Sequence, residues 1–235
     1  MDYARIIKEI KETLESLGTP ERLKKAGYYF STRQRVIGVS NPDIQKVIRA
    51  LRSNHDAWKE EQWIAFSKAL VAQNVFECQV MAFELLGRNK KLLSALEYAD
   101  LADLWHNLDN WASVDHFSVG IYGVLWGKGI VKDQHIRRLL ESKNFWDRRV
   151  AVVSTVSLNL KSRGGRGDTR RTLWVCEKVV DDRQDFIQKA LSWALRELSK
   201  RDPKAVEAFI ARYEDRLSKR VVREVRHKLD FGTKN

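Results

Sequence analysis

Apolar residues recur every three or four positions along almost the whole chain, which is the spacing of one face of an α-helix. The first such run ends at Gly18, and Thr19-Pro20 and Asn41-Pro42 have the capping and first-turn residues that begin helices. The same spacing predicts further helices over 60–71, 75–86, 91–104, 110–125, 132–142, 144–160, 169–180, 184–201, 204–213 and 218–229. No segment alternates apolar and polar residues as a surface strand does, so we expect an all-α protein.

An aromatic residue recurs at the start of several of these helices with nearly constant spacing. The series is Phe76, Trp111, Trp146 and Phe186, separated by 35, 35 and 40 residues. Periods of this length are typical of stacked helix pairs, each too small to bury its apolar face alone. The chain is therefore predicted to be a solenoid of antiparallel helix pairs that forms one domain over 1–235.

One repeat differs from the others by a carboxylate. After Phe76, Trp146 and Phe186, the third and fourth positions hold a long polar residue and then a small apolar one. After Trp111 these positions are Val114-Asp115. Asp115 stands where a helix interior more readily accommodates an apolar side chain, so it is the first candidate for a functional role.

The charge of the chain indicates an anionic partner. The 43 Lys and Arg outnumber the 31 Asp and Glu, which gives a net charge of +12, and eight tryptophans accompany this charge. Nucleic acid fits best because aromatic rings beside cations contact bases as well as phosphates, whereas an acidic membrane surface or a role in solubility alone fits less well.

Cys78 and Cys176 lack metal-ligand spacing and are expected to be buried thiols. No run of 18 apolar residues or signal-peptide core occurs, so we expect an intracellular protein.

Five residues at corresponding positions of adjacent repeats would line one groove, since every second helix of a curved solenoid faces its concave side. They are Trp111, Asp115, Arg149, Trp193 and Arg196. Each also has an ordinary explanation: a helix tryptophan usually belongs to the core, an arginine is usually solvated or paired, and Asp115 could simply pair with Arg149. Their occurrence together on a basic chain favours a functional groove.

The extra residues of the 40-residue gap form a glycine- and arginine-rich segment over 161–171. Its glycines disfavour a helix, and its cations suggest a flexible arm that contacts phosphates; the alternative is a solvated surface loop. The candidate cations are Arg163, Arg166, Arg170 and Arg171.

The segments 110–117, 144–151 and 186–197 resemble the matching segments of the AlkD-type alkylpurine DNA glycosylases, and 36–42 resembles the first inter-helix turn of that family. The resemblance implies a right-handed solenoid of HEAT-like repeats with a concave basic groove. It identifies Asp115 as the catalytic residue, with Trp111 and Trp193 framing the lesion and Tyr29 lining the same cleft. The resemblance also assigns the DNA backbone to arginines, and we add two neighbouring cations. The arginines assigned by resemblance are Arg149 and Arg196, and the added neighbours are Arg148 and Lys189.

This resemblance implies a monofunctional DNA glycosylase that removes cationic N3- or N7-alkylated purines from duplex DNA in base excision repair. It would need no metal or cofactor, bind alkylated duplex DNA but no membrane, act as a monomer, and lie in a bacterial-type cytoplasm with the nucleoid. The alternative is a helical-repeat protein that binds damaged or branched DNA without catalysis. A protein–protein scaffold would leave the charge and the Trp/Arg set unexplained.

Overall fold

The structure is a computed structural model that describes residues 2–105 and 108–233. Within these ranges the chain forms α-helices with short 3₁₀ and π segments and no β-strand, apart from an isolated parallel bridge between Arg35 and Val75. The predicted all-α fold of HEAT-like helix pairs is confirmed. The chain divides into two compact units, Met1–Phe117 and Ser118–Asn235. No described helix has the length and apolar content needed to cross a bilayer.

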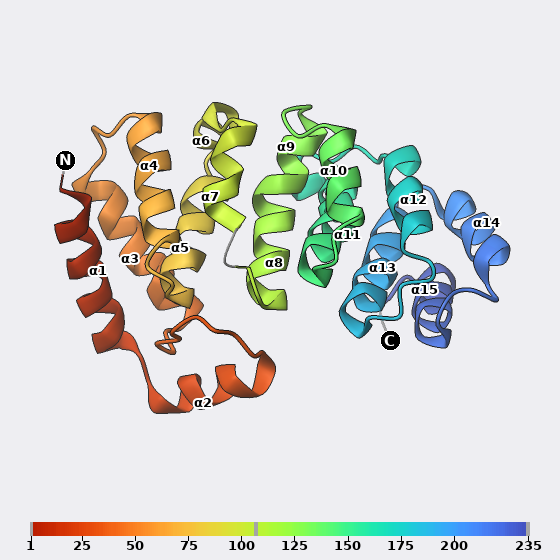
Figure 1. Cartoon of the computed structure of the whole chain (residues 1–235), viewed down its shortest axis with the longest axis horizontal. Coiled ribbons are helices and arrows are strands. Elements are labelled where there is room, and N and C mark those ends of the chain that lie inside the picture. Colours follow the sequence, from red (N-terminus) through yellow and green to blue (C-terminus); the bar gives the residue numbers. More distant parts are fainter. Residues whose placement is uncertain (1, 106–107, 234–235) are drawn as a thin grey trace. The chain divides into compact units, whose positions relative to one another are not determined.

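The first unit consists of helices joined by short connections (Figure 1). They are α1 (Tyr3–Leu17), α2 (Pro20–Tyr29), α3 (Asn41–Asn54), α4 (Glu60–Val71), α5 (Phe76–Gly87), α6 (Lys90–Ala95), the 3₁₀ turn η1 (Tyr98–Asp100), α7 (Leu101–Trp105) and α8 (Trp111–Phe117).

Helix α5 forms the core of this unit. Its side chains are buried almost all round the helix, as expected for a helix enclosed by others, and it packs against α4 and α8. Phe66 and Leu70 of α4 and Met81 and Leu85 of α5 are fully buried. Cys78 lies in the same core as a free thiol, as predicted, and burial raises its pKa to about 12.

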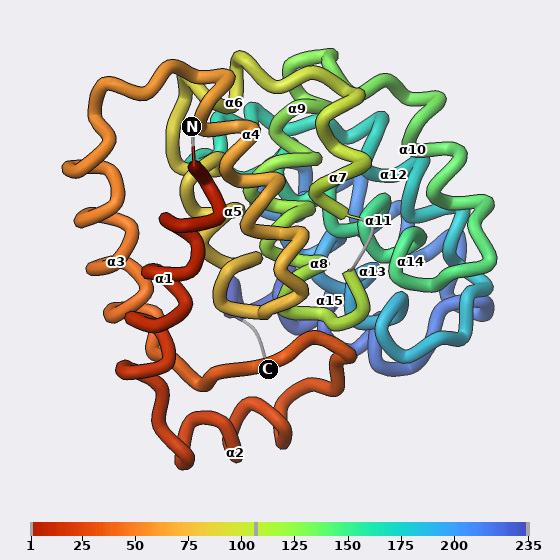
Figure 2. The backbone as a smooth tube through the Cα atoms, turned by 60° about the vertical axis from the view of Figure 1, so that its left-hand side comes forward, coloured from red at the N-terminus to blue at the C-terminus, as the bar shows by residue number. Residues whose placement is uncertain are grey.

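Helix α2 contrasts with α5 because none of its residues is buried. Figures 1 and 2 show it set apart from the other helices of its unit. The hydroxyl of Thr19 caps it by accepting a hydrogen bond from the Arg22 amide (3.3 Å), and the Thr19 amide donates to the carbonyl of Gly38 (3.2 Å). The cap and Pro20 set the start of the helix where the sequence predicts it.

The second unit is organised around α11, which packs against the helices before and after it (Figure 1). Its side chains from Arg149 to Asn159 are all buried. The elements are the π-helical segment η2 (Ser118–Tyr122), α9 (Gly123–Gly127), α10 (Asp133–Leu140), α11 (Phe145–Asn159), the 3₁₀ turn η3 (Lys161–Arg163), α12 (Thr169–Lys178), α13 (Asp185–Leu198), α14 (Pro203–Tyr213) and α15 (Lys219–Phe231).

Two predicted helices are interrupted. The helix expected over 91–104 is divided into α6, η1 and α7, because Leu96 has an extended backbone and the Asp100 carboxylate accepts from the Glu97 amide (2.9 Å) to begin a new turn. The helix expected over 110–125 contains the π segment η2. The hydroxyl of Ser157 on α11 donates to the carbonyl of Val119 in this segment (2.9 Å), so tertiary contact satisfies one of its carbonyl groups.

Gly123 allows α9 to pack closely on α11. A Cβ at this position would lie 2.4 Å from the carbonyl oxygen of Ser154 and 2.7 Å from Oγ of Ser157. We expect Gly123→Ala to lower the free energy of unfolding by about 1–3 kcal/mol, because the two backbones must separate. Urea denaturation measures the loss.

Gly127→Ala is the matched control, since its Cβ would meet only Cδ2 of Leu158 at 3.5 Å, an ordinary contact. It should leave stability unchanged or raise it slightly, because alanine favours the helix. Equal losses in the two variants would contradict the close packing assigned to Gly123.

Candidate functional site

Trp111 and Asp115 both lie on α8 and are both partly exposed. Residues four apart on a helix are neighbours on one face, so the indole and the carboxylate emerge from the same side of α8. The indole N–H of Trp111 donates to the main-chain carbonyl of Tyr29 (3.0 Å). The first unit thus brings the C-terminal end of α2 to the start of α8, as required if Tyr29, Trp111 and Asp115 share a site.

The contact between Tyr29 and Trp111 is made through the main chain of Tyr29. Tyr29 is 60% exposed, and its ring packs edge-on against Tyr28 with centroids 6.0 Å apart. The Tyr29 side chain is therefore available at the surface beside the indole.

Two carboxylates hold the connection between α2 and α3. Asp109 accepts from the hydroxyl of Thr32 (2.6 Å) and the amide of Arg33 (2.7 Å). Burial opposes its ionisation, but these bonds and one from Asn110 outweigh burial and lower the pKa of Asp109. Since Asp109 lies two residues before Trp111, the first residue of α8, it joins this connection to that helix.

The second carboxylate is that of Glu77 in the first turn of α5, which is 2% exposed. It accepts from the consecutive amides of Ile37 (3.0 Å), Gly38 (2.7 Å) and Val39 (3.4 Å). A buried charge in a protein needs such partners, and here three backbone donors supply them. Glu77 therefore fixes the turn that follows α2.

His116, next to Asp115 in the sequence, has a partner on another helix. Its Nε2 lies 3.0 Å from Oε1 of Glu84 on α5, and Gln45 donates to the other carboxylate oxygen (2.8 Å). Burial opposes ionisation of Glu84, but His116, Gln45 and Arg88 together lower its pKa to about 2. The pair anchors α8 to α5 on the side of the helix expected to point away from Asp115.

In the second unit, Arg149 is held at the start of α13. Its side chain is buried, its guanidinium donates to the carbonyl of Phe186, and its Cζ lies 5.9 Å from the centre of the Phe186 ring. The Nζ of Lys189 lies over the same ring at 5.5 Å, and Trp146 packs against it with centroids 4.9 Å apart. Two aromatics of the repeat series thus meet, with two candidate cations beside them.

Three candidate cations of this unit, Arg148, Lys189 and Arg196, lie close to acidic side chains. Nε of Arg148 donates to Asp182 (2.7 Å), and Nζ of Lys189 lies 2.7 Å from Asp185. Arg196 is half-buried; its Nε donates to Oγ of Ser192 (3.1 Å), while Glu224 lies 3.9 Å away. Burial lowers the pKa of Arg196 against the opposing charge of Glu224.

Trp193 is partly exposed on α13. It lies three residues before Arg196, so the two side chains share a face of the helix, as the sequence predicts.

The segment over 161–171 is more ordered than the expected flexible arm. Residues 161–163 form η3, and α12 begins at Thr169, so Arg170 and Arg171 are helical. Both arginines lie near Asp133, with Nε of Arg171 at 2.9 Å and an Nη of Arg170 at 3.7 Å.

The sequence indicates candidates for contact with DNA, but it does not indicate the residues that hold these candidates in place. Asp109 could have been suspected as part of the polar pair preceding α8, where Asn110 accepts from the Ser113 amide (2.9 Å). Glu77 and Glu84 could not be recognised from the sequence, because their partners outside α5 lie 32 to 40 residues away in the chain. Within the described ranges, no three His, Cys, Asp or Glu side chains gather to hold a metal ion.

Helix pairs that carry aromatic and cationic residues at corresponding positions define a helical-repeat protein. Residues 10–229 match the family described as DNA alkylation repair enzyme. The chain belongs to this family, which places it in the repair of alkylated DNA and implies that it binds DNA.

A solved structure is similar over most of both chains. It is described as a predicted DNA alkylation repair enzyme from Enterococcus faecalis, with a TM-score of 0.64, 22% sequence identity, and coverage of 88% of this chain and 94% of that one. At this identity the likeness shows a shared fold. No match was found among curated proteins.

Proposed function

We propose that the protein is a monofunctional DNA glycosylase that hydrolyses the N-glycosidic bond of cationic N3- or N7-alkylated purines in duplex DNA. The observation that carries the proposal is the surface formed by α8, where the Trp111 indole, bonded to the Tyr29 carbonyl, lies one turn from Asp115. A ring beside a carboxylate suits a cationic base attached to a sugar that becomes cationic during the reaction.

The alkylated purine makes a strong general acid unnecessary. Because the base is already positively charged, the glycosidic bond breaks with its electron pair moving to the base, which leaves as a neutral molecule. Positive charge develops on the sugar, as in other glycoside hydrolyses. Water then bonds to the anomeric carbon and loses a proton.

Asp115 supplies the electrostatic part of this reaction. Its carboxylate opposes the charge on the sugar and orients the attacking water or accepts its proton. Trp111 and Tyr29 contact the lesion nucleotide, and a cation–π contact contributes about 1–2 kcal/mol when water is excluded. The resemblance to the family gives the same role to Trp193. Arg148, Arg149, Arg196 and Lys189 bind backbone phosphates, and the loop arginines Arg163, Arg166, Arg170 and Arg171 are further candidates for this contact. The enzyme would act as a monomer in the cytoplasm.

The test uses a duplex with a single 7-methylguanine, incubated with the protein and then treated with alkali to cleave at abasic sites. We expect cleavage at the lesion and slow or no cleavage of a matched duplex containing uracil, because a neutral base leaves poorly without an acid. Comparable rates on both duplexes would indicate a different class of glycosylase. Binding without cleavage of the methylated duplex would instead support the non-catalytic alternative.

A further inference from the structure

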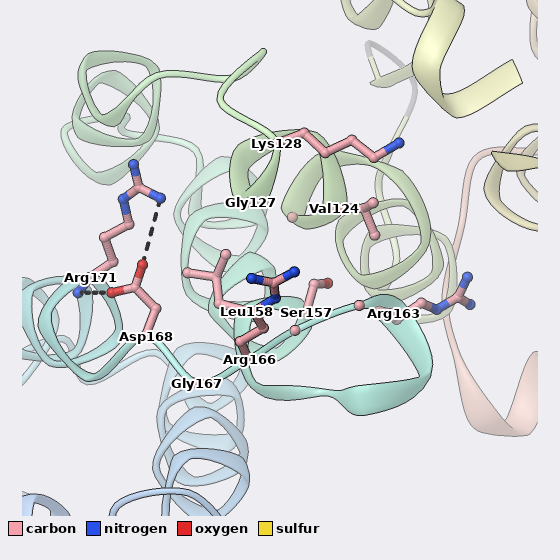
Figure 3. A pocket seen from close by; sticks show the side chains of 13 residues that line it. Val124, Gly127, Lys128, Ser157, Leu158, Arg163, Arg166, Gly167, Asp168 and Arg171 are labelled. Carbon is pink, nitrogen blue, oxygen red and sulfur yellow. Dashed lines mark hydrogen bonds and ion pairs between the residues drawn. The ribbon is translucent and has the colours of Figure 1, made fainter. Parts of the chain in front are cut away.

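A cavity of about 390 Å³ lies in the second unit, between the segment 163–168, the end of α9 and the last turn of α11 (Figure 3). It is called the loop pocket here. Four cationic side chains line it together with one carboxylate, that of Asp168. Figure 3 shows Arg163 and Arg166 extending from the loop, Lys128 from beyond α9, and Arg171 from the start of α12.

The cations of the loop pocket differ in how far the protein already neutralises them. Arg171 lies 2.9 Å from Asp133 and 3.6 Å from Asp168, so acidic neighbours offset its charge. Arg166 is exposed and has no hydrogen bond or ion pair with any other described residue. Arg166 therefore contributes an uncompensated positive charge at this cavity.

The wall of the loop pocket is held in shape by its backbone. The amides of Gly165 and Gly167 donate to the carbonyls of Leu160 (2.9 Å) and Leu158 (3.0 Å) at the end of α11. A Cβ on Gly165 would lie 2.3 Å from the carbonyl oxygen of Ser157, so only glycine allows this approach. Nε of Arg201 donates to the carbonyl of Asn159 in the last turn of α11 (2.8 Å). The pocket thus exists before any ligand arrives.

The loop pocket is separate from the cluster at Arg149. Arg149 lies in the first turns of α11 and points to Phe186, whereas Ser157 and Leu158, which line the pocket, lie in its last turn. Eight or nine residues of helix correspond to about 12–14 Å. A group bound in the pocket would therefore be a second contact at the other end of the same helix.

We propose that the loop pocket binds a backbone phosphate of duplex DNA, with Arg166 as its principal cation. The proposal rests on the duplex binding that the proposed function requires. None of the described residues that line the pocket is aromatic, so nothing there would stack on a base; a phosphate suits it better than a whole nucleotide. The proposal also distinguishes between the loop arginines. Arg166 contacts the phosphate, whereas Arg170 does not, because it pairs with Asp133 and does not line the pocket.

The test compares Arg166→Ser with Arg170→Ser, two exposed arginines four residues apart. Binding of an undamaged duplex is measured over a range of salt concentrations. We expect Arg166→Ser to reduce the slope of log K against log [salt] by about 0.9, the value for one phosphate contact, and Arg170→Ser to leave it close to that of the wild type. Equal slopes for the wild type and Arg166→Ser, or equal reductions in both variants, would overturn the proposal.

A second variant changes the pocket without removing a cation. Gly127 is exposed, and Gly127→Glu adds a carboxylate at the lining. It should weaken duplex binding at low salt several-fold, and unchanged binding would contradict the proposal.

Titration with inorganic phosphate tests whether the pocket binds a free anion instead of DNA. The proposal would be overturned if phosphate bound saturably at micromolar concentration, if Arg166→Ser removed this binding, and if the same variant left the salt slope of duplex binding unchanged.

Excision is measured separately, at saturating protein, so the two proposals fail in different ways. A wild-type protein that binds duplex with the predicted slope change but does not excise 7-methylguanine contradicts the glycosylase and keeps the pocket. A protein that excises normally while Arg166→Ser leaves the slope unchanged contradicts the pocket alone.

Discussion

Asp115→Asn is expected to slow excision of 7-methylguanine by about 100- to 1,000-fold while duplex binding changes only a few-fold. The amide keeps the shape of the side chain but removes the charge that opposes the developing sugar cation, and the loss of one such interaction raises a barrier by about 2.7–4 kcal/mol. The rate is measured in single turnover at saturating protein, so that weaker binding cannot imitate slower chemistry.

Asp56→Asn provides the matched control, because Asp56 is an exposed residue in a turn of the same unit. It makes the same change in net charge and should leave the excision rate unaltered. If Asp115→Asn and wild type excise at equal rates, Asp115 is not the catalytic residue. If both aspartate variants slow excision alike, net charge and not a local carboxylate is responsible.

Glu77→Ala is expected to lower the free energy of unfolding by about 2–4 kcal/mol. The substitution removes the acceptor for the amides of Ile37, Gly38 and Val39, and leaving such groups without partners costs about 1–3 kcal/mol for each that water cannot reach. Gly38 is buried, while Ile37 and Val39 are partly exposed, so the loss should fall short of three full contributions. The change in the urea midpoint measures it.

Glu77→Gln keeps an oxygen acceptor of similar shape and should destabilise the protein less than Glu77→Ala. A loss below about 0.5 kcal/mol for the alanine variant, the range of ordinary surface substitutions, would contradict the role assigned to this carboxylate. Equal losses in the two variants would mean that charge, and not the presence of an acceptor, holds the turn.

The helices could be predicted because their information is local. Apolar spacing, Thr19-Pro20, Asn41-Pro42 and Gly18 each act over one or two turns, and the structure places helix boundaries at these residues. The π segment η2 could not be predicted, because it depends on the Ser157 hydroxyl and on contact with α11, more than 30 residues away.

The features of the candidate site also divide into those that follow from local spacing and those that depend on how helices pack. Trp111 and Asp115 share a helix face by spacing alone, so their proximity follows from the sequence. The bond from Trp111 to the Tyr29 carbonyl spans 82 residues, and the pairing of Arg148 with Asp182 spans 34. Such pairings depend on how helices pack, so the sequence marked which residues could act but not which neighbours hold or neutralise them.

The loop pocket separates two properties that usually change together on a protein surface. Its shape is set by glycines: Gly164 and Gly167 have φ of 79° and 94°, and Gly165 has no room for a side chain. Part of its charge comes from Arg163 and Arg166, each of which is next to one of these glycines in the chain. The charge at these two positions can therefore be changed without changing the loop's conformation, so the affinity for DNA that we propose for this pocket can be adjusted independently of the fold.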